Sequence, residues 1–330
     1  MTNRDSAVPA LAAVVFNPIK VDESRIRLAV EGAAAEAGVV GVLWLSTTID
    51  EGGQAQTREA LASGATLILA AGGDGTVRAV AEALRDQDAD LAILPSGTGN
   101  LLARNIGITH TNLDEACRVA FQGRTRAIDL GVAVATDANG ASVERAFLVM
   151  AGLGIDAAMI ANTRPRLKRQ VGWLAYVDAG FRSLPKARKV RVGYSLDDGE
   201  TRSAHVSTIL VANCGNLPGN IELIPDALID DGILDIAVLQ PKSLFGWLMI
   251  WRKVTWENRV LRKTALGQRI IRLTNRAIRT ELSYLRGGSV RLTVDTPEPF
   301  ELDGDGMGDV SAVHLRVDAG GLRVRVPALS

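Results

Sequence analysis

The amino-acid sequence predicts an α/β domain with a parallel sheet, followed by an antiparallel β-sandwich domain. Its 330 residues are enough for two domains. Up to about residue 125, short apolar runs alternate with helical patterns, which is typical of a parallel sheet covered on both faces. From about Arg126 onward, most predicted strands follow one another without long helices, which is typical of an antiparallel sandwich.

The elements of the first domain follow from apolar runs and from the residues that end them. Asn17-Pro18 stops the first strand, and Gly38 is typical of the residue that follows a helix. The predicted strands are 11–16, 39–45, 66–71 and 89–94, and the predicted helices are 24–37, 54–62, 77–84, 101–105 and 112–121. A last strand, 322–326, returns to this domain, to which we assign residues 1–127, completed by about 318–330.

The second domain, residues 128–317, is predicted from β-rich runs that are separated by turns. Asp197-Asp198-Gly199 is a typical hairpin turn between two of these runs. The predicted strands are 126–133, 146–151, 189–195, 202–212, 234–239, 290–295 and 313–317. Two helical patterns interrupt them, at 172–183 and at about 243–285, and the second is interpreted as an insertion into the sandwich.

Composition excludes several classes of protein. Basic and acidic residues number 37 each, so the net charge indicates no particular partner, and no recognised nucleic-acid-binding module is present. Cys117 and Cys214 lie outside any CxxC motif, which argues against a zinc site or a disulfide framework. No apolar run approaches the ~20 residues of a transmembrane helix. We therefore expect a cytoplasmic protein, associated peripherally with the inner face of the membrane.

Two glycine-rich segments each follow an apolar strand and precede a helix. The first is Gly72-Gly73-Asp74-Gly75-Thr76, and the second is Pro95-Ser96-Gly97-Thr98-Gly99-Asn100. In a parallel sheet such turns lie at the carboxyl edge of the strands, where glycines and helical N–H groups can receive an anion. The alternative for a single such loop is an ordinary turn. Two of them indicate a polyphosphate site, although neither has the Walker or dinucleotide pattern.

Four segments, in this order, resemble the diacylglycerol kinase catalytic-domain family, whose fold is related to that of NAD kinase. They are the two glycine-rich segments, the stretch from Pro225-Asp226-Ala227 to Asp231-Gly232-Ile233-Leu234-Asp235, and Leu302-Asp303-Gly304-Asp305. The resemblance covers nearly the whole chain. It departs at Asn17-Pro18-Ile19-Lys20, which lacks the Ser-Gly of the family, and at Asp305, where the family has Glu.

The resemblance implies a lipid kinase that transfers the γ-phosphoryl group of ATP to the hydroxyl of diacylglycerol or a related lipid, with Mg²⁺. It assigns Asp74 to the catalytic Mg²⁺. Asp305 is the favoured acceptor of the hydroxyl proton and Asp303 is the other candidate, while an ordinary Asp-Gly turn is the alternative. The implied ATP-binding residues are Asn17, Thr47, Gly72, Gly73, Asp74, Gly75, Thr76, Gly97, Thr98 and Asn100.

Some members of the family hold a second, structural Mg²⁺ beside the later acidic segment. The resemblance carries this site to the Asp231 side chain and to backbone carbonyls near Leu228 and Ile233. A β-turn without metal is an equally weighted alternative.

The route to a lipid substrate is suggested by a basic stretch that is rich in tryptophan. Residues 243–286 hold ten basic and two acidic residues, together with Trp247, Trp251 and Trp256. A basic helix with an apolar, aromatic face can lie in the headgroup layer of a membrane. The alternatives are a helix packed on the sandwich or a homodimer contact.

Two other functions of the protein also stay open. One is a kinase of a soluble acceptor such as NAD, and the other is a non-catalytic protein that binds lipid or nucleotide.

Overall fold

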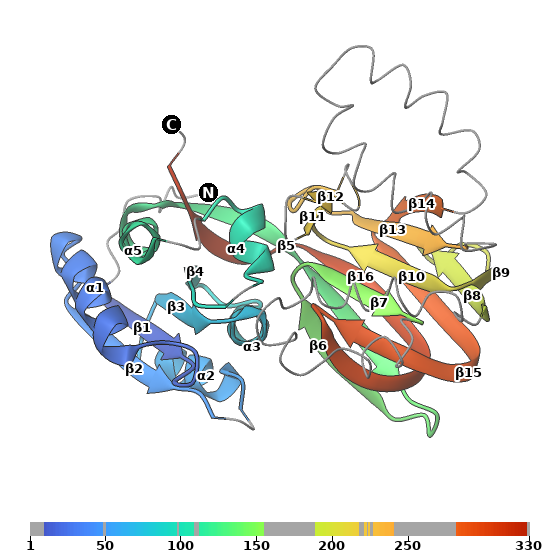
Figure 1. Ribbon diagram of the computed structural model, residues 1–330, viewed down its shortest axis with the longest axis horizontal. Coiled ribbons are helices and arrows are strands. Elements are labelled where there is room, and N and C mark those ends of the chain that lie inside the picture. The colour runs from blue at the N-terminus through green and yellow to red at the C-terminus, as the bar shows by residue number, and fades with distance from the viewer. Residues whose placement is uncertain are drawn as a thin grey trace, which may run out of the picture. The chain divides into compact units, whose positions relative to one another are not determined.

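The computed structural model of the chain describes residues 10–48, 51–97, 99–108, 112–154, 189–217, 221–222, 224, 227–240 and 282–328. The chain divides into two compact units, Met1–Leu130 with Asp318–Ser330, and Gly131–Val317. The sequence analysis places its boundaries after residues 127 and 317. Strands β5 (Arg124–Thr136) and β16 (Asp305–Val326) contribute residues to both units (Figure 1).

In the first unit, strands and helices alternate along the chain, as Figure 1 shows from its blue to its green segments. The elements are β1 (Leu11–Phe16), α1 (Glu23–Glu36), β2 (Gly41–Ser46), α2 (Gln54–Ala62), β3 (Leu67–Gly72), α3 (Asp74–Leu84), β4 (Asp90–Pro95), α4 (Leu101–Asn105) and α5 (Leu113–Gln122).

The sheet of the first unit is parallel, as predicted. Its order is β2–β1–β3–β4, and Leu91 of β4 also pairs in parallel with Val324 near the end of β16. Every residue of β3 is buried, as are all but one in β1 and in β4. Helix α1 packs beside α5, and α2 beside α3. Strands that are buried along their length need cover on both faces, which explains why they are continuously apolar in sequence.

Local signals set the ends of the helices. The Asp22 carboxylate accepts a hydrogen bond from the N–H of Arg25 at 3.1 Å and so caps α1, which ends before Gly38 with its positive φ of 76°. The prediction that α3 begins at residue 77 was wrong, because the helix begins at Asp74. An acidic residue in the first turn of a helix is favoured by the helix dipole. The second half of the GGDGT segment is therefore helical.

A buried carboxylate holds the last strand of the chain in the first unit. Asp90 is 4% exposed, and its two oxygens lie 2.8 Å from Nε of Arg323 and 3.0 Å from Nε of Arg325. The carboxylate of Asp129 accepts a hydrogen bond from the N–H of Gly320 at 2.8 Å. Charged groups that are buried this deeply need such partners. These contacts account for the return of the chain to the first unit.

The second unit is built from strands. They are the end of β5, β6 (Ser142–Phe147), β7 (Met150–Leu153), β8 (Val190–Leu196), β9 (Arg202–Val206), β10 (Thr208–Ala212), β11 (Asn216–Leu217), β12 (Ile221–Glu222), β13 (Leu234–Leu239), β14 (Leu282–Gly287), β15 (Ser289–Leu302) and most of β16.

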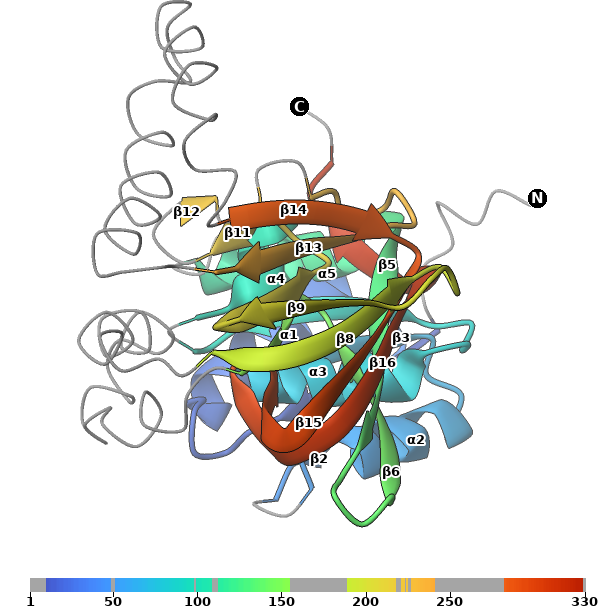
Figure 2. The same ribbon diagram turned by 90° about the vertical axis from the view of Figure 1, so that its right-hand side faces the viewer.

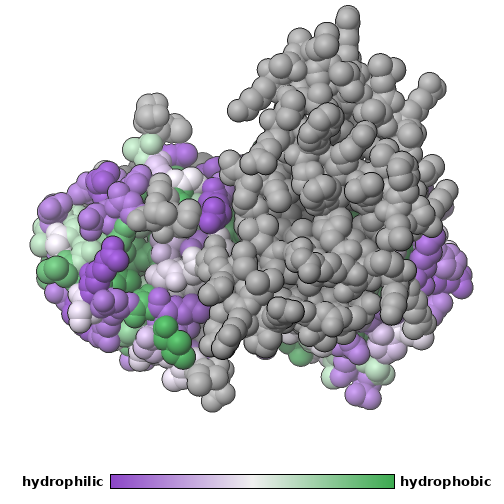
Figure 3. Space-filling model, in the orientation of Figure 1, coloured by the Kyte–Doolittle hydropathy of each residue, from purple (hydrophilic) through white to green (hydrophobic). Residues whose placement is uncertain are grey.

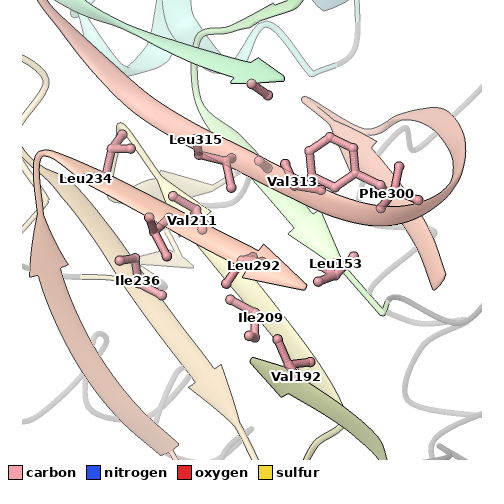
Figure 4. Close-up of a cluster of buried hydrophobic side chains, with 14 of the residues drawn as sticks. Leu153, Val192, Ile209, Val211, Leu234, Ile236, Leu292, Phe300, Val313 and Leu315 are labelled. Carbon is pink, nitrogen blue, oxygen red and sulfur yellow. The ribbon is translucent and has the colours of Figure 1, made fainter. Parts of the chain in front are cut away.

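The strands of the second unit pair antiparallel, as expected for a sandwich. Five of these strands are neighbours in the order β14–β13–β10–β7–β15 (Figure 1). Strand β8 pairs with both β15 and β9 (Figure 2). Strand β15 changes partner along its length, since residues 290–294 pair with β8 and residues 300–302 pair with β7. Apolar side chains of the second unit meet in one cluster, which includes the fully buried Leu234 and Leu315 (Figure 4). Phe147 of β6 belongs to the same cluster.

Three predicted elements of the second unit need correction. Residues 146–151 do not form one strand, because β6 ends at Phe147 and β7 begins at Met150. The predicted strand 202–212 is likewise two strands, β9 and β10. Residues 282–285, placed in a helix, belong to β14, which pairs with β13 along six residues. The predicted helix 172–183 and the rest of the insertion up to residue 281 lie outside the described residues.

Candidate functional site

The two glycine-rich segments of the first unit lie side by side. Strands β3 and β4 are neighbours with Gly72 opposite Pro95, so both segments leave the sheet at the same edge. The N–H of Ser96 donates to the carbonyl of Gly72 at 3.0 Å. A Cβ atom on Gly97 would lie only 2.9 Å from Cα of Gly73. The backbones therefore touch where a side chain on Gly97 would keep them apart.

Asp74 connects the two segments through its side chain. One carboxylate oxygen accepts the N–H of Asn100 at 3.0 Å, and the other accepts the N–H of Leu101 at 2.6 Å. Gly99 is needed beside it, because a Cβ atom there would overlap the Asp74 carboxylate. Asn100 takes up a left-handed conformation with φ of 46°, and its side-chain amide bonds the carbonyl of Gly97. A short polar side chain tolerates this conformation better than most.

The charge on Asp74 is set by opposing effects. Burial raises the pKa of Asp74 above its ordinary value, while the N–H groups of Leu101 and Asn100 and the ammonium of Lys20 act in the opposite direction. Lys20 also lies over the first segment, because its Nζ is 3.2 Å from the position of a Cβ atom on Gly73. The sequence analysis did not select Lys20. The sequence does contain a sign of its role, because Lys20 stands at the position where the Ser of the family's Ser-Gly follows Asn-Pro.

The other predicted nucleotide-binding residues lie just after β1, just after β2 and in α3. The N–H of Asn17 donates to Ala71 at 3.0 Å, and its side-chain oxygen accepts the N–H of Ile19 at 3.0 Å. Thr47 is buried, and its N–H donates to Phe16 at 2.8 Å. Gly75 and the buried Thr76 belong to the first turn of α3. Thr98 lies outside the described residues.

In the second unit, Asp303 and Gly304 form a two-residue hairpin turn between β15 and β16. Both have positive φ, 50° and 86°, and Leu302 pairs with Asp305 across the turn. The Asp303 carboxylate accepts the N–H groups of three consecutive residues at 2.9–3.0 Å, namely Leu148, Val149 and Met150. Its own N–H donates to Met150 at 2.8 Å. Asp303 therefore fastens the tip of the hairpin to the start of β7, and leaves Asp305 exposed beside it.

A third acidic residue, Glu301, stands next to this turn. The pairing of β15 with β16 shifts register between Phe300 and Glu301, and bulges of this kind re-aim side chains. Phe300 and Leu302 point into the core, so Glu301 points to the other face of its strand. Burial raises the pKa of Glu301 to about 7, and the charges of Asp305 and then Asp303 add to the rise. Glu301 was not among the predicted site residues, although an acidic residue between Phe300 and Leu302 of a strand is a recognisable pattern.

Asp231, predicted to hold a structural metal, has a cationic partner. Its carboxylate lies 2.7 Å from Nη2 of Arg286 and also accepts the N–H of Ile233 at 3.2 Å. Leu228 is exposed. Within the part of the chain that the structure describes, no group of three or more His, Cys, Asp or Glu side chains has an arrangement that could hold a metal ion.

Comparison with known families matches both units. Residues 12–133 match the family model of the diacylglycerol kinase catalytic domain, and residues 148–326 match that of the YegS C-terminal NAD kinase beta sandwich-like domain. A Pseudomonas aeruginosa protein named "Probable lipid kinase YegS-like" is 35% identical over 233 residues, which are 69% of this chain and 71% of that one. A Bacillus subtilis diacylglycerol kinase is 31% identical over 56% of this chain and 58% of its own.

Among solved structures, a diacylglycerol kinase from Bacillus anthracis aligns with a TM-score of 0.67. The alignment covers 96% of this chain and 97% of that one, at 20% identity. Yeast NADH kinase aligns with a TM-score of 0.51 at 9% identity, and covers 99% of this chain and 88% of its own. These likenesses show the fold, an NAD kinase-like α/β domain followed by a β-sandwich.

The raised pKa of Glu301 predicts a pH-dependent stability. The folded protein holds this proton up to about pH 7, whereas the ordinary pKa is 4.5, so the contribution of Glu301 to stability is greatest below 4.5 and declines as the pH rises toward 7. Glu301→Gln removes the ionisation. We expect the variant to exceed the natural chain in free energy of unfolding at pH 8, by on the order of 1–3 kcal/mol, and much less at pH 5. Urea titrations at the two pH values measure this difference.

The control for this titration is Glu200→Gln, which removes an exposed carboxylate from the same unit. Its effect on unfolding should be small and independent of pH. A Glu301→Gln effect of the same size at pH 5 and pH 8 would contradict the raised pKa.

Proposed function

The chain belongs to the YegS-like lipid kinase family, and from this premise we propose that it transfers the γ-phosphoryl group of ATP to the hydroxyl of diacylglycerol or a related lipid. The observation that carries the proposal is the Asp74 carboxylate, which joins the two glycine-rich segments through the N–H groups of Asn100 and Leu101. Phosphoryl transfer depends mainly on positioning and on electrostatic stabilisation. The hydrogen bonds that join the two glycine-rich segments would supply the positioning.

The proposed nucleotide contacts are the backbone of both segments and the ammonium of Lys20. Glycines at residues 72, 73, 75 and 97 allow phosphate oxygens to approach the main chain closely. The first turn of the eleven-residue helix α3 directs its N–H groups toward the same end of the sheet. Lys20 lies over Gly73, where a point positive charge would stabilise the phosphate groups.

The residues present fit a Mg²⁺ ion that is bound largely by the nucleotide. Mg²⁺ at kinase sites keeps several waters and uses one or two carboxylates together with substrate phosphates. Asp74 offers one carboxylate, which has about four lone-pair sites and accepts three main-chain N–H groups, those of Asn100, Leu101 and Asp74 itself. When bound, the ion would neutralise charge on the phosphates. Asp74 would hold it directly or through water.

The proposed acceptor of the lipid hydroxyl proton is Asp305. The carboxylate of Asp303, one turn residue away, is engaged by three main-chain N–H groups, whereas Asp305 stands on the exposed start of β16. In the proposed step the hydroxyl oxygen bonds to the γ-phosphorus, its proton passes to Asp305, and ADP leaves. Glu301, with its pKa near neutrality and in electrostatic contact with Asp305, would share that proton.

Contact with a membrane surface is part of the proposal and rests on the composition of residues 243–286. Most of this segment lies outside the described residues. Of the helices in the described ranges, none combines the length and apolarity needed to cross a bilayer. On the described part of the face in Figure 3, hydrophobic and hydrophilic residues are interspersed. A lipid hydroxyl lies at the headgroup level, so an enzyme that docks there reaches it without extracting the lipid.

The proposal predicts that the protein labels a lipid from [γ-³²P]ATP in mixed micelles. A panel of diacylglycerol, sphingosine, ceramide and a glycolipid identifies the acceptor, and NAD serves as the soluble acceptor. Asp74→Ala and Asp305→Asn should each lower kcat by about 100-fold or more, because one removes the loop connection and the other the proton acceptor.

The matched controls remove a carboxylate of the same kind elsewhere. Asp22→Ala deletes a helix cap in the first unit, and Asp309→Asn changes an exposed residue on β16. Both should keep activity close to that of the natural chain. Label on NAD but on no lipid would contradict the proposed reaction. Full activity of Asp305→Asn would contradict the proposed proton acceptor.

A second prediction concerns Lys20. Lys20→Gln should raise the KM for ATP by about 5–10-fold and leave the KM for the lipid unchanged, because only the phosphate contact loses a charge. Lys20→Arg keeps the positive charge, so its KM for ATP should lie between those of the natural chain and of Lys20→Gln. Steady-state kinetics with each substrate varied in turn measures the effect, and an unchanged KM for ATP in Lys20→Gln would remove Lys20 from the nucleotide site.

A further inference from the structure

Arg286 joins two acidic side chains in the second unit. It lies on β14 directly opposite Asp235 of β13, and its Nε is 2.9 Å from the carboxylate of Asp235. Its Nη2 is 2.7 Å from the carboxylate of Asp231, which precedes β13. The Asp235 side chain is 4% exposed and that of Asp231 is 20% exposed. One guanidinium thus bridges two carboxylates at the start of β13.

These residues do not fit the structural Mg²⁺ that the family resemblance implies for this segment. Mg²⁺ requires oxygen ligands in near-octahedral geometry at about 2.0–2.1 Å. One oxygen of Asp231 is engaged by the guanidinium and the other accepts the N–H of Ile233. A doubly charged ion on the same carboxylate would lie within a few ångströms of the Arg286 charge and would be repelled by it.

We propose that Arg286 takes the place of the structural metal ion, so that the second unit of this chain holds the Asp231 turn without a bound divalent cation. The planar guanidinium can bond two carboxylates at once through Nε and Nη2, which a lysine ammonium does less well. The pairing of β13 with β14 brings it to this position, and β14 is the last strand in the order β14–β13–β10. Arg286 therefore also fastens an edge strand to the turn before β13.

The first test uses the natural chain without nucleotide. Thermal unfolding is followed in EDTA and in Mg²⁺ at matched ionic strength. We expect the same Tm in both, and no stoichiometric metal in the purified protein by inductively coupled plasma mass spectrometry. A Tm that falls in EDTA for the natural chain, but not for Asp231→Ala, would overturn the proposal by locating a metal at this residue.

The second test uses a double-mutant cycle. Arg286→Ala and Asp231→Ala should each lower Tm by about 5 °C, and the double variant should fall by much less than their sum, because the two residues act through one contact. Arg291→Ala, which removes an exposed arginine 3.8 Å from Asp198, is the control and should change Tm little. If the Tm losses of the two single variants add up in the double variant, the role of Arg286 is contradicted. A Tm of Arg286→Ala equal to that of Arg291→Ala would also contradict it.

Discussion

The hydrogen bonds from Asn100 and Leu101 to the Asp74 carboxylate are the constraint on which the candidate nucleotide site depends. Two glycine-rich segments at one sheet edge would otherwise be separate flexible loops. Bonds from N–H groups to a charged oxygen contribute about 1.5–3 kcal/mol each. They oppose the burial that raises the pKa of Asp74, and the ammonium of Lys20 acts in the same direction as they do. The site is therefore built around one buried carboxylate that both glycine-rich segments contact.

The second unit uses a carboxylate in the same way. Asp303 gathers three main-chain N–H groups, and this fixes the hairpin that presents Asp305. The two acids lie two residues apart and have different environments, which is how enzymes divide roles between similar side chains. Glu301 adds a third environment, half-buried with its pKa raised to about 7. We propose Asp305, an exposed residue beside this neighbour, as the acceptor of the proton.

Much of this arrangement could be predicted from sequence, because it is local. Continuously apolar strands indicated the parallel sheet. The two glycine-rich segments indicated loops that can bind a ligand, and Asp303-Gly304 indicated a tight turn. The missed features depend on contacts between distant residues. Asp74 meets Leu101 27 positions away, and Arg286 meets Asp231 55 positions away. Lys20 and Glu301 gain their importance only from such neighbours. The break between β9 and β10 falls at Ser207, in a run that has no glycine or proline to signal it.

In the proposed reaction, a lipid hydroxyl receives the γ-phosphoryl group of ATP. The most direct measurement is untargeted mass spectrometry of a bacterial lipid extract that has been incubated with the protein and with ATP carrying ¹⁸O in its γ-phosphoryl group. We expect one class of lipid to gain the labelled phosphoryl group as ADP forms. Labelled phosphate that is found only in water-soluble products, with every lipid unchanged, would contradict it.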